Sequence, residues 1–371
     1  MNKKTIIIIP FILPWDWSAD YQRQTCLELA KTHNVIAYMQ KDAIFVFKAL
    51  IRGKKQYPFH KNITFYQPVY LFPFRRFSFI EEINKRISFL LFQLFQLGLR
   101  KYVLWIFDPC FYFMPNMSVS QSLYDCVDYH QGFHNGDKSS HICTMEKLLI
   151  LRVTFFFVNS NSLYNLHKET RIPDCLVPQG FKIDVFRHPK RSCVQFSKSK
   201  PIIGYVGSID NRLEYTLLEK LITKNSQWHF VFWGPITSEL PKAFYATNVT
   251  LGESNDVYEL PGIIKQFDVG IIPLNCSIPG VLYSFPMKFF EYIYMGIPVV
   301  SSPVRELLRF SKNISIASSA GAWRRDITLL LRGSKSSSMR NADRKFASKN
   351  SWESKIKKIK SKINSQVEIF P

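Results

Sequence analysis

Lys288 and Glu291 are the residues whose types and spacing point most directly to chemistry. Pro286 suits the start of a helix, and the three-residue spacing then places both charged side chains on one helical face. The free N–H groups of a helix N-terminus attract phosphate, and a lysine there adds a full positive charge. A carboxylate one turn further on can accept hydrogen bonds from both hydroxyls of a ribose. The pattern therefore predicts a nucleoside diphosphate site, although a surface Lys–Glu pair on an amphipathic helix fits it as well.

Carboxylates also follow apolar runs in the first half of the chain, at Asp16, Asp125 and Asp128. If these runs are parallel strands, the carboxylates face a cleft at the carboxyl edge of a sheet, where they could orient the hydroxyls of an acceptor or a donor. The alternative is that an aspartate after a strand serves only in a turn or as a helix cap. His130 and His134 lie just beyond, and we interpret them as ordinary loop residues.

Several familiar cofactor and metal motifs do not occur in the sequence. The seven cysteines are scattered, none forms a Cys-x-x-Cys pair, and no Asp-x-Asp motif or His/Cys cluster suggests a metal. No Walker loop is present, and no G-x-G-x-x-G follows the first apolar run. These patterns argue against a disulfide framework, a structural zinc site, an NTPase and a nicotinamide dehydrogenase. We therefore expect no metal and no cofactor, and a reduced cytosolic compartment.

Short apolar runs that alternate with amphipathic stretches must position these residues. The expected strands are 6–9, 35–39, 102–107, 122–124, 154–158, 202–206, 229–233, 249–251, 269–272 and 299–301. The expected helices are 21–31, 79–99, 139–151, 213–223, 257–265 and 287–295. Short strands rich in β-formers that alternate with helices predict parallel sheets covered on both faces.

The alternation stops once, in the basic and proline-bounded segment 187–201. A chain of 371 residues exceeds the usual size of one domain. We therefore predict an α/β protein with two doubly wound domains, 1–186 and 202–371, joined by a linker and facing each other across a cleft that holds the ligand.

The last predicted helix begins near Trp352, with Asn350 as N-cap and Glu353 three residues further on. Trp352, Ile356, Ile359 and Ile363 fall on one face, and lysines cover the rest. We expect the apolar face to pack on the core and the helix to return toward the first domain.

The formal net charge of +21 predicts an anionic partner: nucleic acid, an acidic membrane leaflet or a phosphorylated small molecule. Nucleic acid is disfavoured, because the basic residues are spread over the chain and no recognition module is present. Segment 44–58 mixes aromatic, aliphatic and basic residues. A helix and loop lying against a membrane would have this composition, and a partly buried helix with a basic exit loop fits it equally.

Two apolar segments raise the question of a membrane span or a signal peptide. The run 5–13 follows two lysines but is broken by Pro10 and has no cleavage site, so a buried first strand explains it better. Segment 88–99 carries two glutamines and is shorter than the ~20 apolar residues that a spanning helix needs. We therefore expect a cytoplasmic protein that is peripheral at the inner face of the plasma membrane.

The segment SFPMKFFEYIYMGIPVVSS (284–302) resembles the donor-binding segment of GT-B glycosyltransferases of the family 4, or glycosyl transferase group 1, type. The usual pattern there is P-x-K-x-x-E-Y/A-x-x-x-G-x-P-V-V. Other stretches resemble the family in the same order: LYDCVDYHQGF, EKLLILRVTFFFVNSNSLYNLH, VPQGFKIDVFRHP, IIGYVGSIDNRLEYTLLEKL and ELPGIIKQFDVGIIPL. Within the family the chain most resembles bacterial teichuronic-acid and capsule-type transferases.

The resemblance implies two Rossmann-like domains and transfer of a sugar from a UDP- or GDP-sugar to a glycan or lipid-linked acceptor, with retention and without a metal. It assigns Lys288 to the diphosphate and Glu291 to the ribose, with Pro286 in the same motif. Gly207 and Ser208 would let the backbone approach the phosphates. Arg212 would be the second basic residue, and with Lys288 it would stabilise the departing diphosphate. The same resemblance supports a catalytic role for Asp125 and Asp128.

Two positions depart from the family pattern. The family often has Glu-x7-Glu, but Tyr283 stands where the first glutamate is expected, and Ser208 stands where many members have arginine. The first departure leaves open a non-catalytic GT-B partner subunit, and both leave the donor sugar open.

Overall fold

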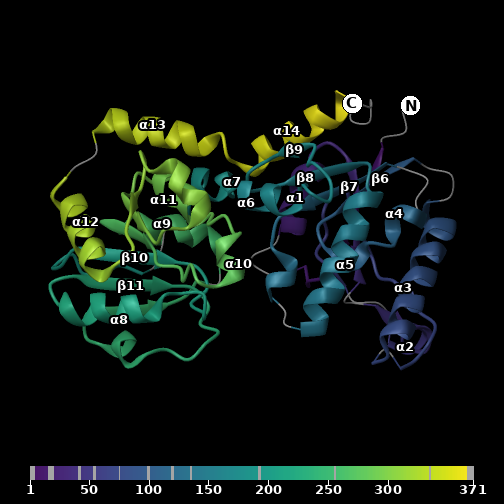
Figure 1. Ribbon diagram of the computed structural model, residues 1–371, viewed down its shortest axis with the longest axis horizontal. Coiled ribbons are helices and arrows are strands. Elements are labelled where there is room, and N and C mark those ends of the chain that lie inside the picture. Colours follow the sequence, from purple (N-terminus) through teal and green to yellow (C-terminus); the bar gives the residue numbers. More distant parts are fainter. Residues whose placement is uncertain are drawn as a thin grey trace. The chain divides into compact units, whose positions relative to one another are not determined.

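The computed structural model describes residues 5–15, 21–40, 43–52, 56–74, 76–97, 101–117, 121–133, 136–190, 194–254, 256–333 and 336–365. The chain forms two compact units (Figure 1). One comprises Met1–Val177 with Ile356–Pro371, and the other comprises Pro178–Lys355. The segment 187–201, which the sequence suggests as the linker, belongs to the second unit.

The first unit contains a seven-stranded parallel sheet in the order β4-β2-β1-β6-β7-β8-β9. Its strands are β1 (Ile6–Phe11), β2 (Asn34–Met39), β4 (Ile63–Tyr66), β6 (Tyr102–Ile106), β7 (Gln121–Cys126), β8 (Phe155–Val158) and β9 (Cys175–Leu176). Its helices include α1 (Tyr21–Ala30), α3 (Ser78–Phe92), α4 (Met114–Met117), α5 (Gly136–Arg152) and α6 (Asn161–His167). A separate parallel pair, β3 (Ile44–Phe45) with β5 (Val69–Tyr70), leads into α2 (Val46–Arg52).

The second unit contains a six-stranded parallel sheet in the order β12-β11-β10-β13-β14-β15. Its strands are β10 (Ile202–Val206), β11 (His229–Trp233), β12 (Val249–Gly252), β13 (Val269–Ile272), β14 (Val299–Ser301) and β15 (Ser315–Ile316). Its helices include α7 (Ile183–Arg187), α8 (Tyr215–Lys224), α9 (Leu260–Ile264), α10 (Pro279–Leu282), α11 (Lys288–Tyr294), α12 (Ala320–Arg332) and α13 (Ser337–Ser348).

Alternate residues of β10 explain why its sequence is apolar throughout. Ile202 and Val206 point into one hydrophobic core, while Ile203 and Tyr205 point into another on the opposite face of the sheet. Both faces of a parallel sheet are covered, so its strands have no polar alternation. The predicted fold class, an α/β protein with parallel sheets in both halves, is confirmed.

The last helix, α14 (Trp352–Asn364), contributes to the core of the first unit. Ile356, Ile359 and Ile363 are buried together with Ile7 and the other inward residues of β1. Two local details of this helix differ from the prediction: the residue that caps its N-terminus and the burial of Lys355.

The N-cap of α14 is Ser351 rather than Asn350. The Ser351 hydroxyl accepts a hydrogen bond from the Ser354 N–H at 3.2 Å, whereas the Asn350 amide donates back to the Phe346 carbonyl. Lys355 is also buried instead of solvated, and its ammonium donates to the Gln179 side chain at 3.3 Å. The helix therefore starts one residue later than the motif suggests.

None of the helices in the described part of the chain combines the length and hydropathy that a bilayer-spanning segment requires. Residues 88–92 of the apolar segment 88–99 form the end of α3, and Gln93–Leu97 form a π-helical turn.

Candidate functional site

The second unit brings the predicted nucleotide residues together at the carboxyl edge of its sheet. β10 is hydrogen-bonded to β11 on one side and to β13 on the other, so the strand order reverses at β10. Doubly wound sheets bind their ligands at such reversal points. Gly207 follows β10 directly, Gly234 follows β11, and α11 begins at Lys288 in the segment after β13.

Gly207 and Gly234 hold the backbones of two loops in close contact. Their φ angles are 135° and 148°, a region that favours glycine. The Gly207 N–H donates to the Trp233 carbonyl at 2.9 Å, and a Cβ atom on Gly234 would collide with the Gly207 carbonyl group. Neither position has room for a side chain, so a ligand here would meet bare backbone.

The Lys288 side chain lies against the Gly207 loop. A Cβ atom built on Gly207 would be only 2.5 Å from the Lys288 Nζ, and that Nζ lies 5.2 Å from the centre of the Tyr205 ring. Within the described residues, neither the Lys288 ammonium nor the Glu291 carboxylate takes part in a hydrogen bond or ion pair. Both groups are therefore available to a ligand.

Burial opposes the charge of both groups. Desolvation lowers the pKa of Lys288, and the nearby Arg212 guanidinium lowers it further, while Glu291 and Asp210 act in the opposite direction. Desolvation raises the pKa of Glu291, and the positive charges of Lys288 and Lys182 offset this only in part. A desolvated ammonium and carboxylate without ion-pair partners are typical of a binding site, because a ligand can supply what burial removed.

Arg212 is already paired in this structure. Its guanidinium binds Asp210 in a bidentate ion pair whose shortest N···O distance is 2.6 Å. Burial tends to raise the pKa of Asp210, but the hydrogen bonds from Arg212 and the charge of Lys288 outweigh it, so the pKa is lowered. Arg212 and Lys288 therefore both act on Asp210, and the negative charge of Asp210 partly balances their two positive charges.

The other predicted residues of this motif lie nearby. Pro286 is buried and precedes α11, whose N-cap is Met287, so Pro286 lies just outside the helix rather than in its first turn. Ser208 uses its backbone carbonyl to accept a hydrogen bond from the Tyr205 hydroxyl at 2.9 Å. Tyr283, which stands in place of the usual glutamate, forms the C-cap of α10.

Comparison with known proteins places this geometry in context. No known family profile matches the sequence. Over 232 residues the chain is 25% identical to TuaH of Bacillus subtilis strain 168, which is assigned as a glycosyltransferase of teichuronic acid biosynthesis. The aligned region covers 56% of this chain and 57% of TuaH, so the chain spans little more than half of that relative.

Solved structures show similarity over almost the whole chain. HepE of Anabaena, in complex with UDP and glucose, superposes with a TM-score of 0.68 at 12% identity and covers 98% of this chain and 100% of its own. A UDP-forming trehalose-phosphate synthase of Burkholderia vietnamiensis gives a TM-score of 0.67 at 11% identity, covering 98% of this chain and 97% of its own. The chain has the GT-B fold. At these identities the likeness shows the fold alone.

In the first unit the two predicted acidic residues that are described, Asp125 and Asp128, differ in their exposure to solvent. Asp125 lies within β7 and has no exposed surface, so a bound molecule cannot contact it directly in this conformation. Asp128 is partly exposed after β7, and its carboxylate accepts a hydrogen bond from the Tyr21 hydroxyl at 3.5 Å. Asp16 and His134 fall outside the described residues.

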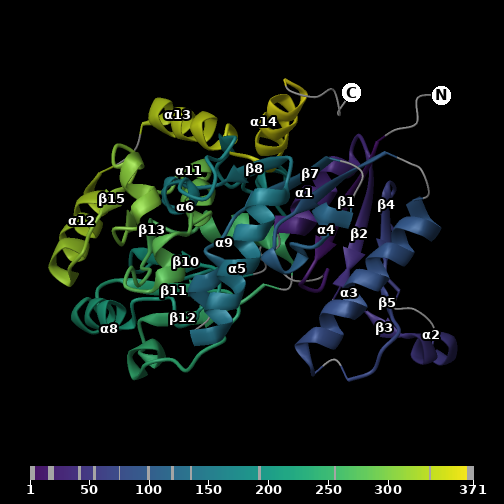
Figure 2. The same ribbon diagram turned by 45° about the vertical axis from the view of Figure 1, so that its right-hand side comes forward.

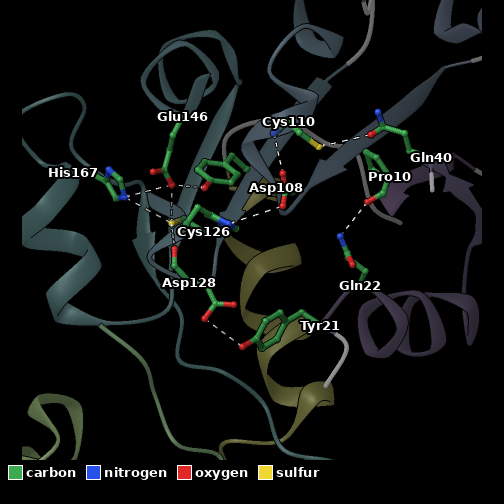
Figure 3. Close-up of polar contacts among 12 residues, drawn as sticks. Pro10, Tyr21, Gln22, Gln40, Asp108, Cys110, Cys126, Asp128, Glu146 and His167 are labelled. Atoms are coloured by element: carbon green, nitrogen blue, oxygen red, sulfur yellow. Dashed lines mark hydrogen bonds and ion pairs between the residues drawn. The ribbon is translucent and has the colours of Figure 1, made fainter. Parts of the chain in front are cut away.

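A buried polar cluster lies beside Asp128, and sequence reasoning missed it (Figure 3). The Cys126 Sγ lies 3.6 Å from a Glu146 carboxylate oxygen and 3.8 Å from the His167 Nε2. The same Glu146 oxygen lies 3.7 Å from His167 and accepts a hydrogen bond from the Tyr124 hydroxyl at 2.6 Å. These residues come from β7, α5 and α6, so no local motif could reveal the cluster.

The chemistry of this cluster favours a hydrogen-bonded network. Its three candidate ligand atoms all lie within 4.8 Å of one another, a spacing that would also suit a metal ion. However, burial raises the pKa of the Cys126 thiol well above its usual value and the Glu146 charge raises it further. Burial also lowers the pKa of His167. A neutral thiol and a neutral imidazole can both hydrogen-bond to one carboxylate, and we interpret the cluster as the support of the loop that carries Asp128.

Asp108 is a further acidic residue at the same edge of the GT-B sheet that sequence reasoning missed. It follows β6, its carboxylate accepts a hydrogen bond from the Cys110 N–H at 2.9 Å, and it lies 4.0 Å from the His130 Nδ1. The available signal was an aspartate directly after the apolar run 102–107. Figure 3 shows Asp108 and Asp128 on neighbouring loops with Pro10 and Gln40 at the ends of β1 and β2.

Proposed function

We propose that this GT-B protein is a glycosyltransferase that uses a UDP-sugar as its donor. The observation that carries the proposal is the Lys288 ammonium held against Gly207, without a hydrogen bond or ion pair among the described residues, with the Glu291 carboxylate one turn further along α11. The similar HepE has been solved with UDP and with UDP-glucose. TuaH, the related sequence, is assigned as a glycosyltransferase.

In this proposal each residue has a distinct task. The bare backbone at Gly207 and Gly234 admits the diphosphate, and Glu291 accepts hydrogen bonds from the ribose hydroxyls. When the bond from the sugar to the diphosphate breaks, the leaving UDP gains negative charge, and Lys288 stabilises that charge. Arg212 contributes a second positive charge on the same loop. The family resemblance supports transfer without a metal and with retention of anomeric configuration.

The proposed acceptor is a glycan or a lipid-linked carrier in the synthesis of a cell-surface polysaccharide. Its support is the likeness to TuaH, which is assigned to teichuronic acid biosynthesis, together with the resemblance of the sequence motifs to capsule-type transferases. Asp128, the partly exposed carboxylate of the first unit, is the candidate for orienting an acceptor hydroxyl. We propose that the protein works in the cytoplasm at the inner face of the membrane, where such carriers are available.

A panel of UDP- and GDP-sugars tests the proposal, with calorimetry for binding and nucleoside diphosphate release for turnover. UDP is expected to bind, and at least one UDP-sugar is expected to release UDP when a lipid-linked acceptor is added. The matched variants are Lys288→Ala and Lys224→Ala, since Lys224 is an exposed lysine at the end of α8 in the same unit. Only the first should weaken UDP binding. Equal affinity in both variants and the wild type would refute the site.

Tyr283 supports a second candidate, a non-catalytic GT-B partner subunit, because the carboxylate usual at that position is missing. The same experiment separates the two functions. A partner subunit binds UDP but releases none from any donor in the panel.

A further inference from the structure

The short helix α2 exposes the side that a helix normally buries. Phe47, Leu50 and Ile51 have the spacing of a single helical face, and each side chain is 79% exposed. In a globular protein an apolar stripe of this kind ordinarily faces the core. Exposed apolar groups gathered on one element mark an interaction site.

A second exposed apolar segment follows β5. Its exposed members are Leu71, Phe72, Phe74, Phe77 and Phe79. The buried Asn84 of α3 fixes the start of this segment, because its side chain accepts from the Leu71 and Phe72 N–H groups at 3.1 and 2.9 Å and donates to the Phe72 carbonyl at 2.9 Å. These hydrogen bonds fix the backbone at Leu71 and Phe72, while the aromatic side chains of the segment remain exposed.

The topology places these two segments together. β3 and β5 pair in parallel, with Ile44 opposite Val69 and Phe45 opposite Tyr70. α2 begins directly after β3, and the segment from Leu71 begins directly after β5, so both leave the same edge of this pair. Both α2 and α3 contact β5, as Figure 2 shows.

Exposed apolar side chains continue along α3 and into the π-helical turn Gln93–Leu97 that follows it. Phe79, Ile83 and Leu90 of α3 and Leu94 of the turn are exposed and are spaced by four, seven and four residues, so they lie on one helical face. We name the exposed apolar side chains of α2, of 71–74 and 77–79, and of this helical face the apolar surface.

The charge around the apolar surface is positive. Between Ala43 and Ile80 the sequence contains seven Lys or Arg residues and no Asp or Glu. Lys48 and Arg76 are exposed among the apolar groups, and the Arg76 guanidinium lies 4.9 Å from the centre of the Phe77 ring. The next acidic residues, Glu81 and Glu82, form ion pairs with Lys85 and Arg86.

We infer that the apolar surface binds the interface of a membrane that contains anionic phospholipids. Aromatic and aliphatic side chains enter the boundary between headgroups and acyl chains, and the basic residues meet the lipid phosphates. A second copy of this chain is a poorer occupant, because it would bring two basic surfaces together. The inference extends the proposed function, since a lipid-linked acceptor lies at such an interface, but vesicle binding does not depend on activity.

Co-sedimentation of the full chain with vesicles tests this inference. The vesicles contain either phosphatidylcholine alone or phosphatidylcholine with phosphatidylglycerol. The test variant is Phe47→Ser with Leu50→Ser and Ile51→Ser, and a second variant combines Phe74→Ser with Phe79→Ser. The control variant combines Leu151→Ser, Ile172→Ser and Tyr245→Ser, whose side chains are 63%, 68% and 71% exposed outside the apolar surface. Affinity for UDP and the circular dichroism spectrum report folding in every variant.

We expect the wild type and the control variant to bind anionic vesicles, and binding to weaken as salt is raised. The two test variants should lose at least tenfold in vesicle affinity and keep their affinity for UDP. Hydrogen exchange should show protection of α2 and 71–79 when vesicles are added. Vesicle binding that is unchanged in both test variants overturns the inference, as does a dimer that the same substitutions abolish. Failure of the wild type to bind UDP would instead refute the proposed function.

Discussion

The Lys288 ammonium occupies the space that a side chain on Gly207 would need, because a Cβ atom there would lie 2.5 Å from Nζ. Gly207 follows β10 and Lys288 begins α11, so the contact joins residues 81 positions apart at the point where the strand order reverses. The glycine and the lysine therefore act as one unit, and each can be tested through the other.

Gly207→Ala is expected to displace Lys288 and to strain the loop. The φ angle of 135° is unfavourable for alanine, at a cost of about 1–3 kcal/mol. We predict a loss of UDP affinity of at least about tenfold, since one charge-assisted hydrogen bond is worth roughly 1.5–3 kcal/mol. Calorimetry with UDP measures the effect. Gly321→Ala is the control, because a Cβ atom on Gly321 meets open space, and it should leave UDP affinity unchanged.

Lys288→Met is expected to increase thermal stability while it weakens UDP binding. Desolvation dominates the environment of Lys288 and lowers its pKa, so the folded state disfavours the charged ammonium. A neutral side chain of similar length removes this penalty, and a gain of about 1 kcal/mol corresponds to a Tm increase of about 2–4 °C. Thermal unfolding with and without UDP measures both effects. A Tm below that of the wild type would show that Glu291 and Asp210 stabilise the ammonium more than burial opposes it.

As pH is raised, UDP binding is expected to weaken at a lower pH than it would if Lys288 were exposed to solvent. The pKa of Lys288 lies below 10.5 in the folded state, so the unfolded chain binds more protons between that lowered pKa and 10.5. Stability of the free protein therefore rises with pH across this window, relative to Lys288→Met. UDP affinity falls across the same window as the ammonium loses its proton. UDP titrations between about pH 7 and 10 check this, and an unchanged affinity would contradict it.

Most of the fold could be predicted because its signals are local. The strands β10, β11, β13 and β14 lie where the apolar runs indicate, since both faces of a parallel sheet are buried. The short strands β3, β4, β5, β9 and β15 were not predicted. β4 lies at the edge of its sheet, where Ile63 and Phe65 alternate with Thr64 and Tyr66, and so brief an alternation is weak evidence by itself.

The candidate site was predictable only where one segment carries it. Lys288 and Glu291 share one helix, so their spacing suffices. The surroundings of Lys288 depend on residues far along the chain, such as Gly207 and Tyr205. The pairing of Arg212 with Asp210, by contrast, joins residues only two positions apart. The Cys126–Glu146–His167 cluster is assembled by three elements, so its residues carry no signal that sequence spacing can express.

Arg212→Ala is expected to weaken UDP binding less than Lys288→Ala does. Arg212 is about half exposed and is bound to Asp210, so a phosphate must compete with that carboxylate and with water. We predict a loss of about three- to tenfold, or roughly 0.7–1.4 kcal/mol. Asp210→Asn should strengthen UDP binding, because it frees the guanidinium and removes a negative charge near the phosphates. Calorimetry on both variants and their combination measures the coupling, and additive effects would show that Asp210 does not act through Arg212. Unchanged UDP affinity in Arg212→Ala would separate Arg212 from the site.

Ile359→Ala is expected to destabilise the first unit although position 359 lies near the end of the chain. Ile359 has no exposed surface, and it is buried with Ile7 and the other residues of the first unit's core. Loss of three methyl or methylene groups from a filled core costs about 2–5 kcal/mol. Urea unfolding measures the loss, and hydrogen exchange of β1 and β6 shows which unit opens.

The residues of the candidate nucleotide site all lie within Pro178–Lys355, so UDP affinity should persist in dilute urea while β1 and β6 exchange faster. Lys357→Ala, at an exposed position of the same helix, should change neither measurement. Equal loss of protection in β10 and β13 would mean that α14 stabilises both units, and its core contacts with the first would then not account for its role.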